Sequence, residues 1–206
     1  MSAAALLRTP VHAVAAAEHP VDALLALYAR LGAQSYGTES ISQLAHALQS
    51  AWLAEMAAAP DSLIAAALLH DVGHLLQEDQ HEAPREDHAA VGARWLVQWF
   101  GPEVVEPIRL HAQAKRYLIA TEPGYYDGLT PASRHSLSWQ GAALAEDERR
   151  RFAALPYARD AVALRRWDDR AKDPAAHPPP LSHYRALLED LVNPPAAAPF
   201  ALRKRG

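Results

Sequence analysis

The chain has 206 residues, of which half are hydrophobic, and a formal net charge of −4 at pH 7. It contains no cysteine, which excludes disulfides and thiolate metal sites, and its mixed charges give no basic face of the kind that nucleic acid binding needs. Arg8, Pro10 and His12 interrupt the Ala-rich start, and no apolar run is long enough to cross a membrane, so we expect a soluble, cytoplasmic protein.

Ala and Leu dominate the composition and β-branched residues are sparse, so the sequence predicts an all-α fold. Helical spacing of apolar residues predicts a first helix over 21–32, which ends in a glycine. A second helix follows over 41–59, with Ser40 as its expected cap. The third, over 62–77, is apolar on nearly all sides and is therefore expected at the centre of a helical bundle.

Gly and Pro separate the later elements. Helices are predicted over 88–101 and 102–120, then a loop with one short helix over 121–141, then two helices over 145–173 that are interrupted at Pro156. These elements predict three parts. An N-terminal extension (1–20) precedes the helical domain (21–173), and a peripheral Pro/Ala-rich tail (174–206) carries one short helix at 184–192.

The stretch LLHDVGHLL places His70, Asp71 and His74 in an apolar run, where burying such groups is costly unless something binds them. On one continuous helix His70 and Asp71 would point about 100° apart and both reach one ion beside it. Further candidates on buried faces are His46, His88, His111 and Asp168. Each alone has a simpler interpretation, such as a hydrogen-bonded core histidine, but together they form a cage of four histidines and two aspartates.

The number of ligands predicts two metal ions that share Asp71. The other ligands divide into His46, His70 and Asp168 for one ion, and His88 and His111 for the second. Imidazole and carboxylate ligands with vacant positions suit iron, manganese or zinc, and do not choose among them.

A second pattern places a polar group one helical turn from a metal ligand on three helices. The groups are His74, four residues after His70; Lys115, four after His111; and Arg165, three before Asp168. Such a cationic wall is typical of a site for a phosphate, a phosphonate or another oxyanion. The alternative is that Lys115 and Arg165 are solvated helix charges.

The ligand order H…HD…D resembles that of the HD-domain superfamily, which is best known for metal-dependent phosphohydrolases. Over residues 22–173 the chain resembles more closely the phosphonate-degrading HD-domain oxygenases, relatives of 2-amino-1-hydroxyethylphosphonate dioxygenase and of the oxygenase for its trimethylated analogue. The specific stretches are YGTESISQLAHALQSA, with a Tyr-Gly-x-Glu segment seven residues before the first histidine ligand, and SLSWQG followed by LRRWDDRAKD, which favours Asp168 over Asp169 as the last ligand.

The resemblance implies an HD-domain helical bundle with a mixed-valent Fe(II)/Fe(III) pair at its centre and O2 as co-substrate. It implies that Tyr36 and Glu39 form a gating pair, in which the tyrosine occupies one iron and the glutamate holds it by a hydrogen bond until substrate enters. It also implies that His74, Lys115, Ser133 and Arg165 bind the phosphonate. The oligomeric state stays open.

The implied reaction is oxidative cleavage of the C–P bond of 2-amino-1-hydroxyethylphosphonate, giving glycine, or of its N-trimethylated analogue, giving glycine betaine, with inorganic phosphate. A quaternary ammonium favours aromatic faces, for which Tyr125, Tyr126 and Trp139 are candidates. Two alternatives remain: a dinuclear HD phosphohydrolase acting on a phosphate ester, and a helical binding module with a structural metal. Tyr36 and Glu39 favour the oxygenase, since they have no evident use in a hydrolase.

Overall fold

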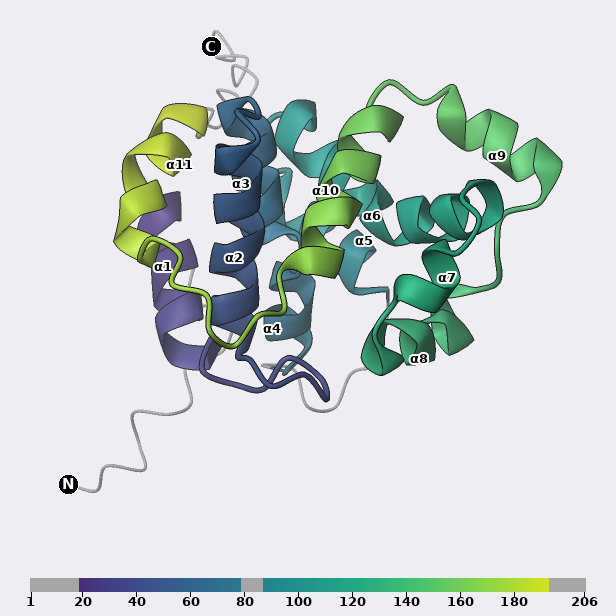
Figure 1. The fold of residues 1–206 in the computed structure, drawn as a ribbon. Coiled ribbons are helices and arrows are strands. Elements are labelled where there is room, and N and C mark those ends of the chain that lie inside the picture. The colour runs from purple at the N-terminus through teal and green to yellow at the C-terminus, as the bar shows by residue number, and fades with distance from the viewer. Residues whose placement is uncertain (1–18, 79–86, 193–206) are drawn as a thin grey trace, which may run out of the picture.

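The computed structural model describes residues 19–78 and 87–192. Within these ranges the chain forms helices and no β-strand, which confirms the predicted all-α fold (Figure 1). The predicted extension 1–20 lies almost wholly outside the described residues, as do most of the polar stretch after α4 and the end of the tail. The helices are α1 (Pro20–Leu31), α2 (Gln43–Met56), α3 (Asp61–Leu69), α4 (Val72–Glu78), α5 (His88–Leu96), α6 (Pro102–Thr121), α7 (Tyr125–Gly128), α8 (Pro131–Gln140), α9 (Glu146–Ala153), α10 (Ala158–Arg170), the 3-10 helix η3 (Leu181–Tyr184) and α11 (Arg185–Leu191).

The apolar helix α3 lies at the centre of the bundle, as predicted. Every residue from Leu63 to Leu69 is buried, and α3 contacts α2, α6 and α10. A smaller second core, which includes Leu110, Phe152 and Ala161, joins α6, α9 and α10. The elements that pack around α3 are also those that carry the candidate metal ligands, so the main core fixes where these ligands meet.

The prediction of one continuous helix over 62–77 is wrong at His70 and Asp71. α3 ends at Leu69 and α4 begins at Val72, so these two residues lie in a turn rather than on a helix face. His70 Nδ1 donates to the Ala67 carbonyl, 2.9 Å away, which holds the ring against the end of α3. The turn redirects the chain so that α4 packs on α5, and the two side chains reach the same place by a different geometry from the one predicted.

Two glycines let α4 and α5 approach closely. A Cβ at Gly73 would lie 1.9 Å from the carbonyl oxygen of His88, and a Cβ at Gly92 would lie 3.2 Å from the backbone nitrogen of Gly73. Only glycine fits where two backbones approach this closely. This contact brings the start of α5, and with it His88, next to Asp71.

Three element boundaries differ from the prediction. Ser42 rather than Ser40 caps α2, with its side chain accepting from the backbone nitrogen of Ala45. The residues between Ser35 and Ser42 form turns and bends that are closed by an antiparallel bridge between these two serines, so the helix begins only after the bridge. α5 ends at Leu96 instead of continuing to residue 101, and the following turns bring Phe100 into the core. The segment 121–141 contains two helices, α7 and α8, instead of one.

The short helix expected in the tail is present as α11, but it is not peripheral. Tyr184 and Leu188 are each only 1 % exposed and belong to the main core. α11 packs against α1 and α3, which Figure 1 shows as its neighbours. The described part of the tail therefore completes the bundle.

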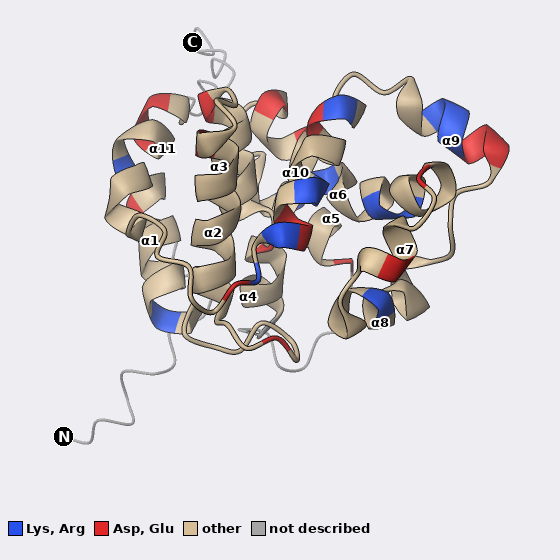
Figure 2. Ribbon diagram, viewed as in Figure 1, with Lys and Arg blue, Asp and Glu red and all other residues tan. Residues whose placement is uncertain are grey.

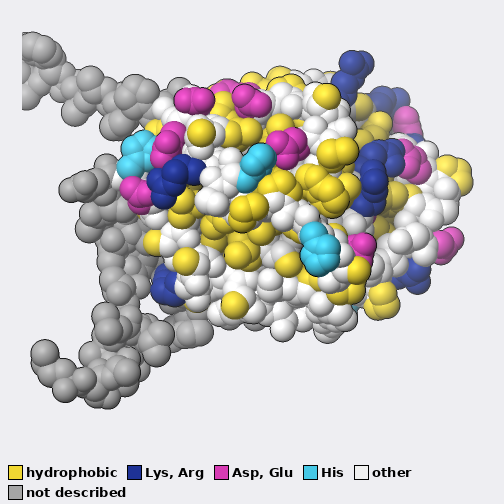
Figure 3. Space-filling view, turned by 60° about the vertical axis from the view of Figure 1, so that its left-hand side comes forward, with side chains coloured by type: hydrophobic (Ala, Val, Ile, Leu, Met, Phe, Trp, Pro, Cys, Tyr) yellow, Lys and Arg dark blue, Asp and Glu magenta, His cyan; other side chains and the backbone are white. Residues whose placement is uncertain are grey.

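The surface carries charges of both signs. Figure 2 shows acidic and basic residues along α9 and α10, whereas α2 and α3 are mostly without charge. On the face in Figure 3, hydrophobic side chains are interspersed with single acidic, basic and histidine side chains, and neither sign of charge predominates. Among the described residues, no helix has the length and apolar character that a membrane span needs.

We expect Gly73→Ala to destabilise the protein, because its methyl group would overlap the His88 backbone and force α4 and α5 apart. Overpacking of this kind costs about 1–3 kcal/mol, or more where backbone must move. Thermal unfolding followed by circular dichroism measures the effect. The matched control is Gly128→Ala on α7, where a Cβ meets nothing within 4 Å; equal melting temperatures for the two variants would contradict the argument.

Candidate metal centre and cavity

Six polar side chains meet at the centre of the bundle, and none of them exposes more than 7 % of its surface. They are His46 from α2, His70 and Asp71 from the turn between α3 and α4, His88 from α5, His111 from α6, and Asp168 from α10. The structure therefore brings together all six residues that the sequence analysis put forward as metal ligands.

The first group of donors consists of His46, His70 and Asp168. His46 Nδ1 donates to the Ala171 carbonyl at 2.8 Å, as His70 Nδ1 does to Ala67. Since each neutral ring then carries its only hydrogen on Nδ1, each Nε2 presents a lone pair. The two Nε2 atoms are 3.2 Å apart, and Asp168 Oδ1 lies 3.4 Å from that of His46.

The second group consists of His88, His111 and one oxygen of Asp71. His111 Nδ1 donates to the Ile108 carbonyl at 2.7 Å, and its Nε2 lies 3.1 Å from His88 Nε2. Asp71 Oδ1 is 3.3 Å from His88 Nε2 and 3.6 Å from His111 Nε2. His74 stacks on His88 with ring centroids 4.1 Å apart, and its Nε2 lies 4.0 Å from Asp71 Oδ1, so it borders this group.

Asp71 lies between the two groups. Its Oδ2 is 3.6 Å from His46 Nε2 and 3.5 Å from His70 Nε2, while Oδ1 faces the second group. Oδ2 is buried and has no hydrogen-bond partner. A carboxylate with one oxygen toward each histidine pair has the arrangement of a bridging ligand.

This donor set fits metal ions. Lone pairs that face lone pairs cannot hydrogen-bond to one another, so a buried cluster of acceptors needs a cation. Adjacent nitrogen ligands about 2.1 Å from one metal ion lie roughly 3 Å apart, and the two pairs of Nε2 atoms are 3.2 and 3.1 Å apart. The Nδ1 contacts to backbone carbonyls fix the ring orientations, as is usual around metal-bound histidine.

Burial and neighbouring charges set the protonation states. Burial lowers the pKa of His70 and His111, so both rings are neutral at pH 7. Burial alone would raise the pKa of Asp71 and of Asp168, but the nearby His70 ring and the Arg165 guanidinium respectively bring these pKa values well below the usual range. Neutral imidazoles and ionised carboxylates are the forms that bind metal.

A cavity of about 640 Å³ opens beside this cluster. Four of the candidate ligands line it, namely Asp71, His88, His111 and Asp168. The four residues that the family resemblance assigns to phosphonate binding line it as well: His74, Lys115, Ser133 and Arg165. A small molecule in this cavity would contact the metal ligands on one side and cationic groups on another.

The cations of this wall differ in how their charges are balanced. Arg165 pairs with both Asp168 and Asp169. Lys115 Nζ donates to Ser136 Oγ at 2.6 Å and to the Ser133 carbonyl at 3.3 Å, and no carboxylate of the described residues pairs with it. Burial, with a contribution from Arg165, lowers the pKa of Lys115 to about 7. Lys115 is thus a buried cation that lacks an anion, as expected of an anion-binding residue.

Tyr36 and Glu39 both border the cavity but do not bond to each other through their side chains. Tyr36 stacks on the His46 ring with centroids 3.8 Å apart, and its hydroxyl lies 3.5 Å from Asp168 Oδ1. Glu39 instead accepts a hydrogen bond of 2.6 Å from Thr130 Oγ1, at the N-terminus of α8. The structure therefore has no side-chain hydrogen bond between Tyr36 and Glu39 of the kind that the family resemblance implies, and the carboxylate of Glu39 bonds to Thr130 instead.

Sequence reasoning missed two residues that support the site. Lys172 donates to Ser133 Oγ at 2.7 Å, and the buried Gln49 pairs with the backbone of Asp173. One signal was available: Lys172 follows Asp168 by four residues, the offset that singled out His74 and Lys115. Gln49 gave no such signal, because its partner is a backbone group far along the chain.

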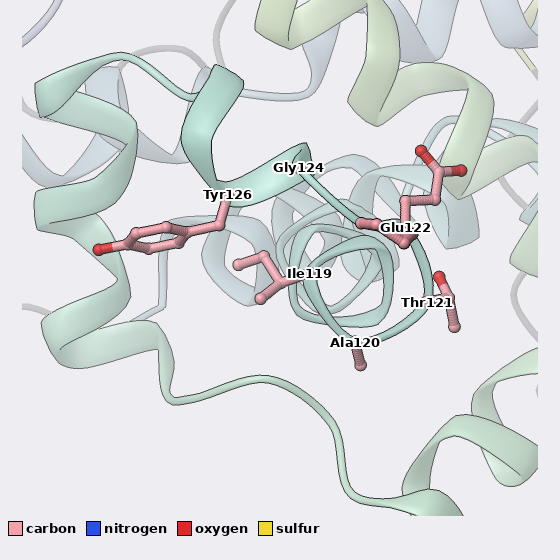
Figure 4. A pocket seen from close by; sticks show the side chains of 7 residues that line it. Ile119, Ala120, Thr121, Glu122, Gly124 and Tyr126 are labelled. Carbon is pink, nitrogen blue, oxygen red and sulfur yellow. The ribbon is translucent and has the colours of Figure 1, made fainter.

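A second, smaller cavity of about 270 Å³ lies where α6 meets α7 (Figure 4). Ile119, Glu122 and Tyr126 are among its lining residues. Its one carboxylate, Glu122, pairs with Arg166. This cavity lacks the uncompensated polar groups that mark the larger one.

Comparison with known proteins identifies an HD domain and two similar phosphonate dioxygenases. The sequence model of the HD domain matches residues 43–169. The chain is 43% identical over 164 residues to a hydroxymethylphosphonate dioxygenase of Gimesia maris, which covers 77% of this chain and 82% of that protein. It is 32% identical over 177 residues to a glycine-betaine-forming [1-hydroxy-2-(trimethylamino)ethyl]phosphonate dioxygenase of Leisingera caerulea, with 84% of this chain and 90% of that protein covered.

We expect His111→Ala to lose one of two bound metal ions, because it removes the buried nitrogen 3.1 Å from His88 Nε2 and leaves only the partly exposed His74 beside His88 and Asp71. Elemental analysis of protein loaded with Fe(II) under argon measures the metal content per chain. His135→Ala is the control, since His135 lines the same cavity but lies outside both ligand groups. Two ions per chain in His111→Ala would show that His111 is not a ligand.

We expect Lys115→Met to raise the melting temperature at pH 7 and to weaken the binding of inorganic phosphate. The folded-state pKa of Lys115, about 7, lies below its usual value of 10.5, so folding opposes protonation of this amine and costs stability below pH 10.5. The stabilisation of the variant should therefore vanish as the pH rises above about 10.5, where the amine is neutral in both states. Loss of the cation should lower phosphate affinity by at least about tenfold, measured by calorimetry.

The metal content of Lys115→Met should match that of the unmodified protein, since Lys115 lies outside both ligand groups. Unchanged phosphate affinity in this variant would remove Lys115 from the anion site.

Proposed function

This chain belongs to the HD-domain family, and within it to the phosphonate-degrading oxygenases; we propose that its substrate is a small 1-hydroxyphosphonate, in the first place hydroxymethylphosphonate. The enzyme cleaves a C–P bond with O2. With this substrate the reaction takes up one O2 and releases formate and inorganic phosphate, so that both oxygen atoms end in the two products. The observation that carries the proposal is the buried donor cluster that opens onto a cavity with an unpaired buried lysine.

We propose two iron ions as the metals, in a mixed-valent Fe(II)/Fe(III) state. When bound, the iron pair supplies the redox chemistry by which O2 oxidises the carbon that bears the hydroxyl group. The residues that would hold the pair are His46, His70 and Asp168 on one side, His88 and His111 on the other, and Asp71 between them. Support for iron comes from the relatives, which are named as dioxygenases.

The wall of the cavity would bind and orient the phosphonate group. Lys115, Ser133 and His74 present a cation, a hydroxyl and an imidazole toward the space beside the metal ligands. Arg165 has a different part in this proposal: its pairs with Asp168 and Asp169 fix the carboxylate of the last metal ligand, while its remaining face lines the cavity. A phosphonate held on this wall places its neighbouring carbon toward the metal centre.

Tyr36 is positioned to control access to the first metal group. Its ring covers His46, and its hydroxyl lies beside Asp168. Burial first, and then the charge of Asp168, raise the pKa of Tyr36, so the phenol keeps its proton unless a cation is close. We therefore propose that Tyr36 would close the first metal group to other ligands when no substrate is bound. Glu39 would hold the loop that carries Tyr36 through the hydrogen bond that it accepts from Thr130.

The organic end of the cavity favours a small substrate. Of the three aromatic residues considered for a quaternary ammonium, only Trp139 lines the cavity. Tyr125 donates to Asp169, and Tyr126 lies at the smaller cavity with Arg134 over its ring. A trimethylammonium group needs several aromatic faces around it, so an aromatic cage is missing here and the trimethylated and free-amine substrates become the second choice.

The test is phosphate release coupled to O2 uptake by iron-loaded protein. It compares hydroxymethylphosphonate, 2-amino-1-hydroxyethylphosphonate and the N-trimethylated analogue at equal concentration. We expect one phosphate per O2, formate as the second product, and a kcat/KM for hydroxymethylphosphonate at least about tenfold above the other two. His70→Ala, which removes a ligand of the first group, is the inactive control.

Two results would overturn parts of the proposal. Faster turnover of the trimethylated analogue would keep the oxygenase but refute the argument from the aromatic residues. Phosphate release from phosphate esters without O2, with no release from any phosphonate, would identify a dinuclear phosphohydrolase.

A further inference from the structure

Lys172 lies just after α10, next to Ser133 and Tyr36, two residues that line the larger cavity. Its Nζ donates to Ser133 Oγ at 2.7 Å and lies 6.0 Å from the centre of the Tyr36 ring. It is half-buried, and no carboxylate of the described residues forms an ion pair with it. The ammonium group of Lys172 therefore contacts a neutral hydroxyl group rather than a carboxylate.

This contact fixes what the Ser133 hydroxyl can do. An ammonium group has only hydrogens to give, so Ser133 Oγ must accept from Lys172. The Ser133 hydrogen is then left for another acceptor, and Ser133 is a buried residue that lines the cavity. The carbonyl of the same residue takes hydrogen bonds from Lys115 and from Ser136 Oγ, at 3.3 and 2.9 Å. Ser133 is thus held on both its side chain and its backbone, with its hydroxyl hydrogen free for a ligand.

The backbone around Lys172 is anchored to α2 on both sides. The preceding carbonyl, of Ala171, accepts from the metal-ligand candidate His46. The following residue, Asp173, accepts at its carbonyl from Gln49 Nε2 at 2.9 Å and donates from its nitrogen to Gln49 Oε1 at 3.0 Å. Gln49 is 3 % exposed and stands one helical turn after His46. The segment 171–173, which leaves α10 toward α11 (Figure 1), therefore has little freedom to move Lys172 away.

The choice of residue type points the same way. The chain has three lysines and seventeen arginines, and both lysines of the described residues contact Ser133. A lysine delivers a compact charge with three donors from a flexible stem, whereas an arginine presents a planar fork that suits carboxylates. Single hydroxyl and carbonyl acceptors in a confined space suit lysine better.

We propose that Lys172 is a positioning residue for phosphonate recognition that acts through Ser133, by taking up the hydroxyl oxygen so that its hydrogen points to a phosphonate oxygen. The proposal rests on the proposed function and adds a residue outside the set His74, Lys115, Ser133 and Arg165. In this arrangement Lys172 also adds a second cation that forms no ion pair among the described residues and that, like Lys115, contacts Ser133. Gln49 sets the position of Lys172 through the segment 171–173.

The test is a double-mutant cycle on Lys172 and Ser133 with methylphosphonate as the probe, which has the anionic group but no hydroxyl to oxidise. Calorimetry on metal-loaded protein under argon compares the unmodified protein, Lys172→Met, Ser133→Ala and the double variant. Each single change should weaken binding about tenfold, as expected for a hydrogen bond to a charged group. The double variant should bind no more than about threefold more weakly than Ser133→Ala, because coupled residues are not additive.

Kinetics separate this role from a general loss of structure. With hydroxymethylphosphonate, Lys172→Met should raise KM about tenfold with kcat changed by less than about threefold, and Lys172→Arg, which keeps a donor, should recover part of the affinity. If Lys172→Met does not fold, Lys172→Gln, which keeps the length of a polar side chain, replaces it in the cycle. Arg150→Met is the matched control, an exposed cation on α9 paired with Asp147, and should change neither constant.

Two outcomes would overturn the proposal: losses that multiply to about a hundredfold in the double variant, which would mean a direct contact of Lys172 with the anion, or an affinity and KM unchanged in Lys172→Met. Failure of the proposed function gives a different result. In that case the unmodified protein would release no phosphate from any 1-hydroxyphosphonate, while the binding cycle would still report on Lys172.

Discussion

Imidazole lone pairs and two carboxylates face one another at the centre of this bundle, and acceptors cannot satisfy acceptors. The cluster is buried, and Asp71 Oδ2 has no hydrogen-bond partner among the described residues. The fold supplies what a protein can: backbone carbonyls of Ala67, Ile108 and Ala171 take the Nδ1 hydrogens of three rings. What remains is negative charge and lone pairs pointing inward, which metal cations would balance.

That requirement explains features of the fold that packing alone does not. The turn at His70 and Asp71 breaks the most apolar helix of the chain, and the glycine contact between α4 and α5 presses two backbones together at the same level. The residues around both features, such as Val72 and Ala93, also belong to the main core. Both features bring ligands from neighbouring elements within 4 Å of Asp71. The helix is thus interrupted at the position of the candidate ligands, and such departures from regular structure are common at functional sites.

The sequence predicted the helices, and the candidate ligands that it put forward lie together in the structure, because both predictions depend on residue type and spacing. Apolar periodicity located the central helix, and the rarity of buried His and Asp singled out the six ligands. What spacing could not show were contacts made by backbone atoms. The cap at Ser42 depends on a bridge to Ser35, the turn after Leu69 on a carbonyl of α3, and Gln49 on the backbone of Asp173. Each partner is an amide group that every residue has, so no residue pattern marks it.

Charge balance links the metal centre to the choice of substrate. Arg165 is committed to Asp168 and Asp169, so its charge is compensated inside the protein. Lys115 and Lys172 contact hydroxyl and carbonyl oxygens and pair with no acid among the described residues, which leaves two positive charges next to Ser133 when Lys115 is protonated. A phosphonate dianion would match two such charges. Burial lowers the pKa of Lys115, and the negative charge of the bound anion would raise this pKa again. The cavity offers few aromatic contacts to the rest of the substrate, since among the described residues Trp139 and Tyr36 are the only Phe, Tyr or Trp side chains that line it. With the proposed substrate, recognition would therefore depend on the anionic group, and the organic substituent would be selected by the space available to it rather than by specific contacts.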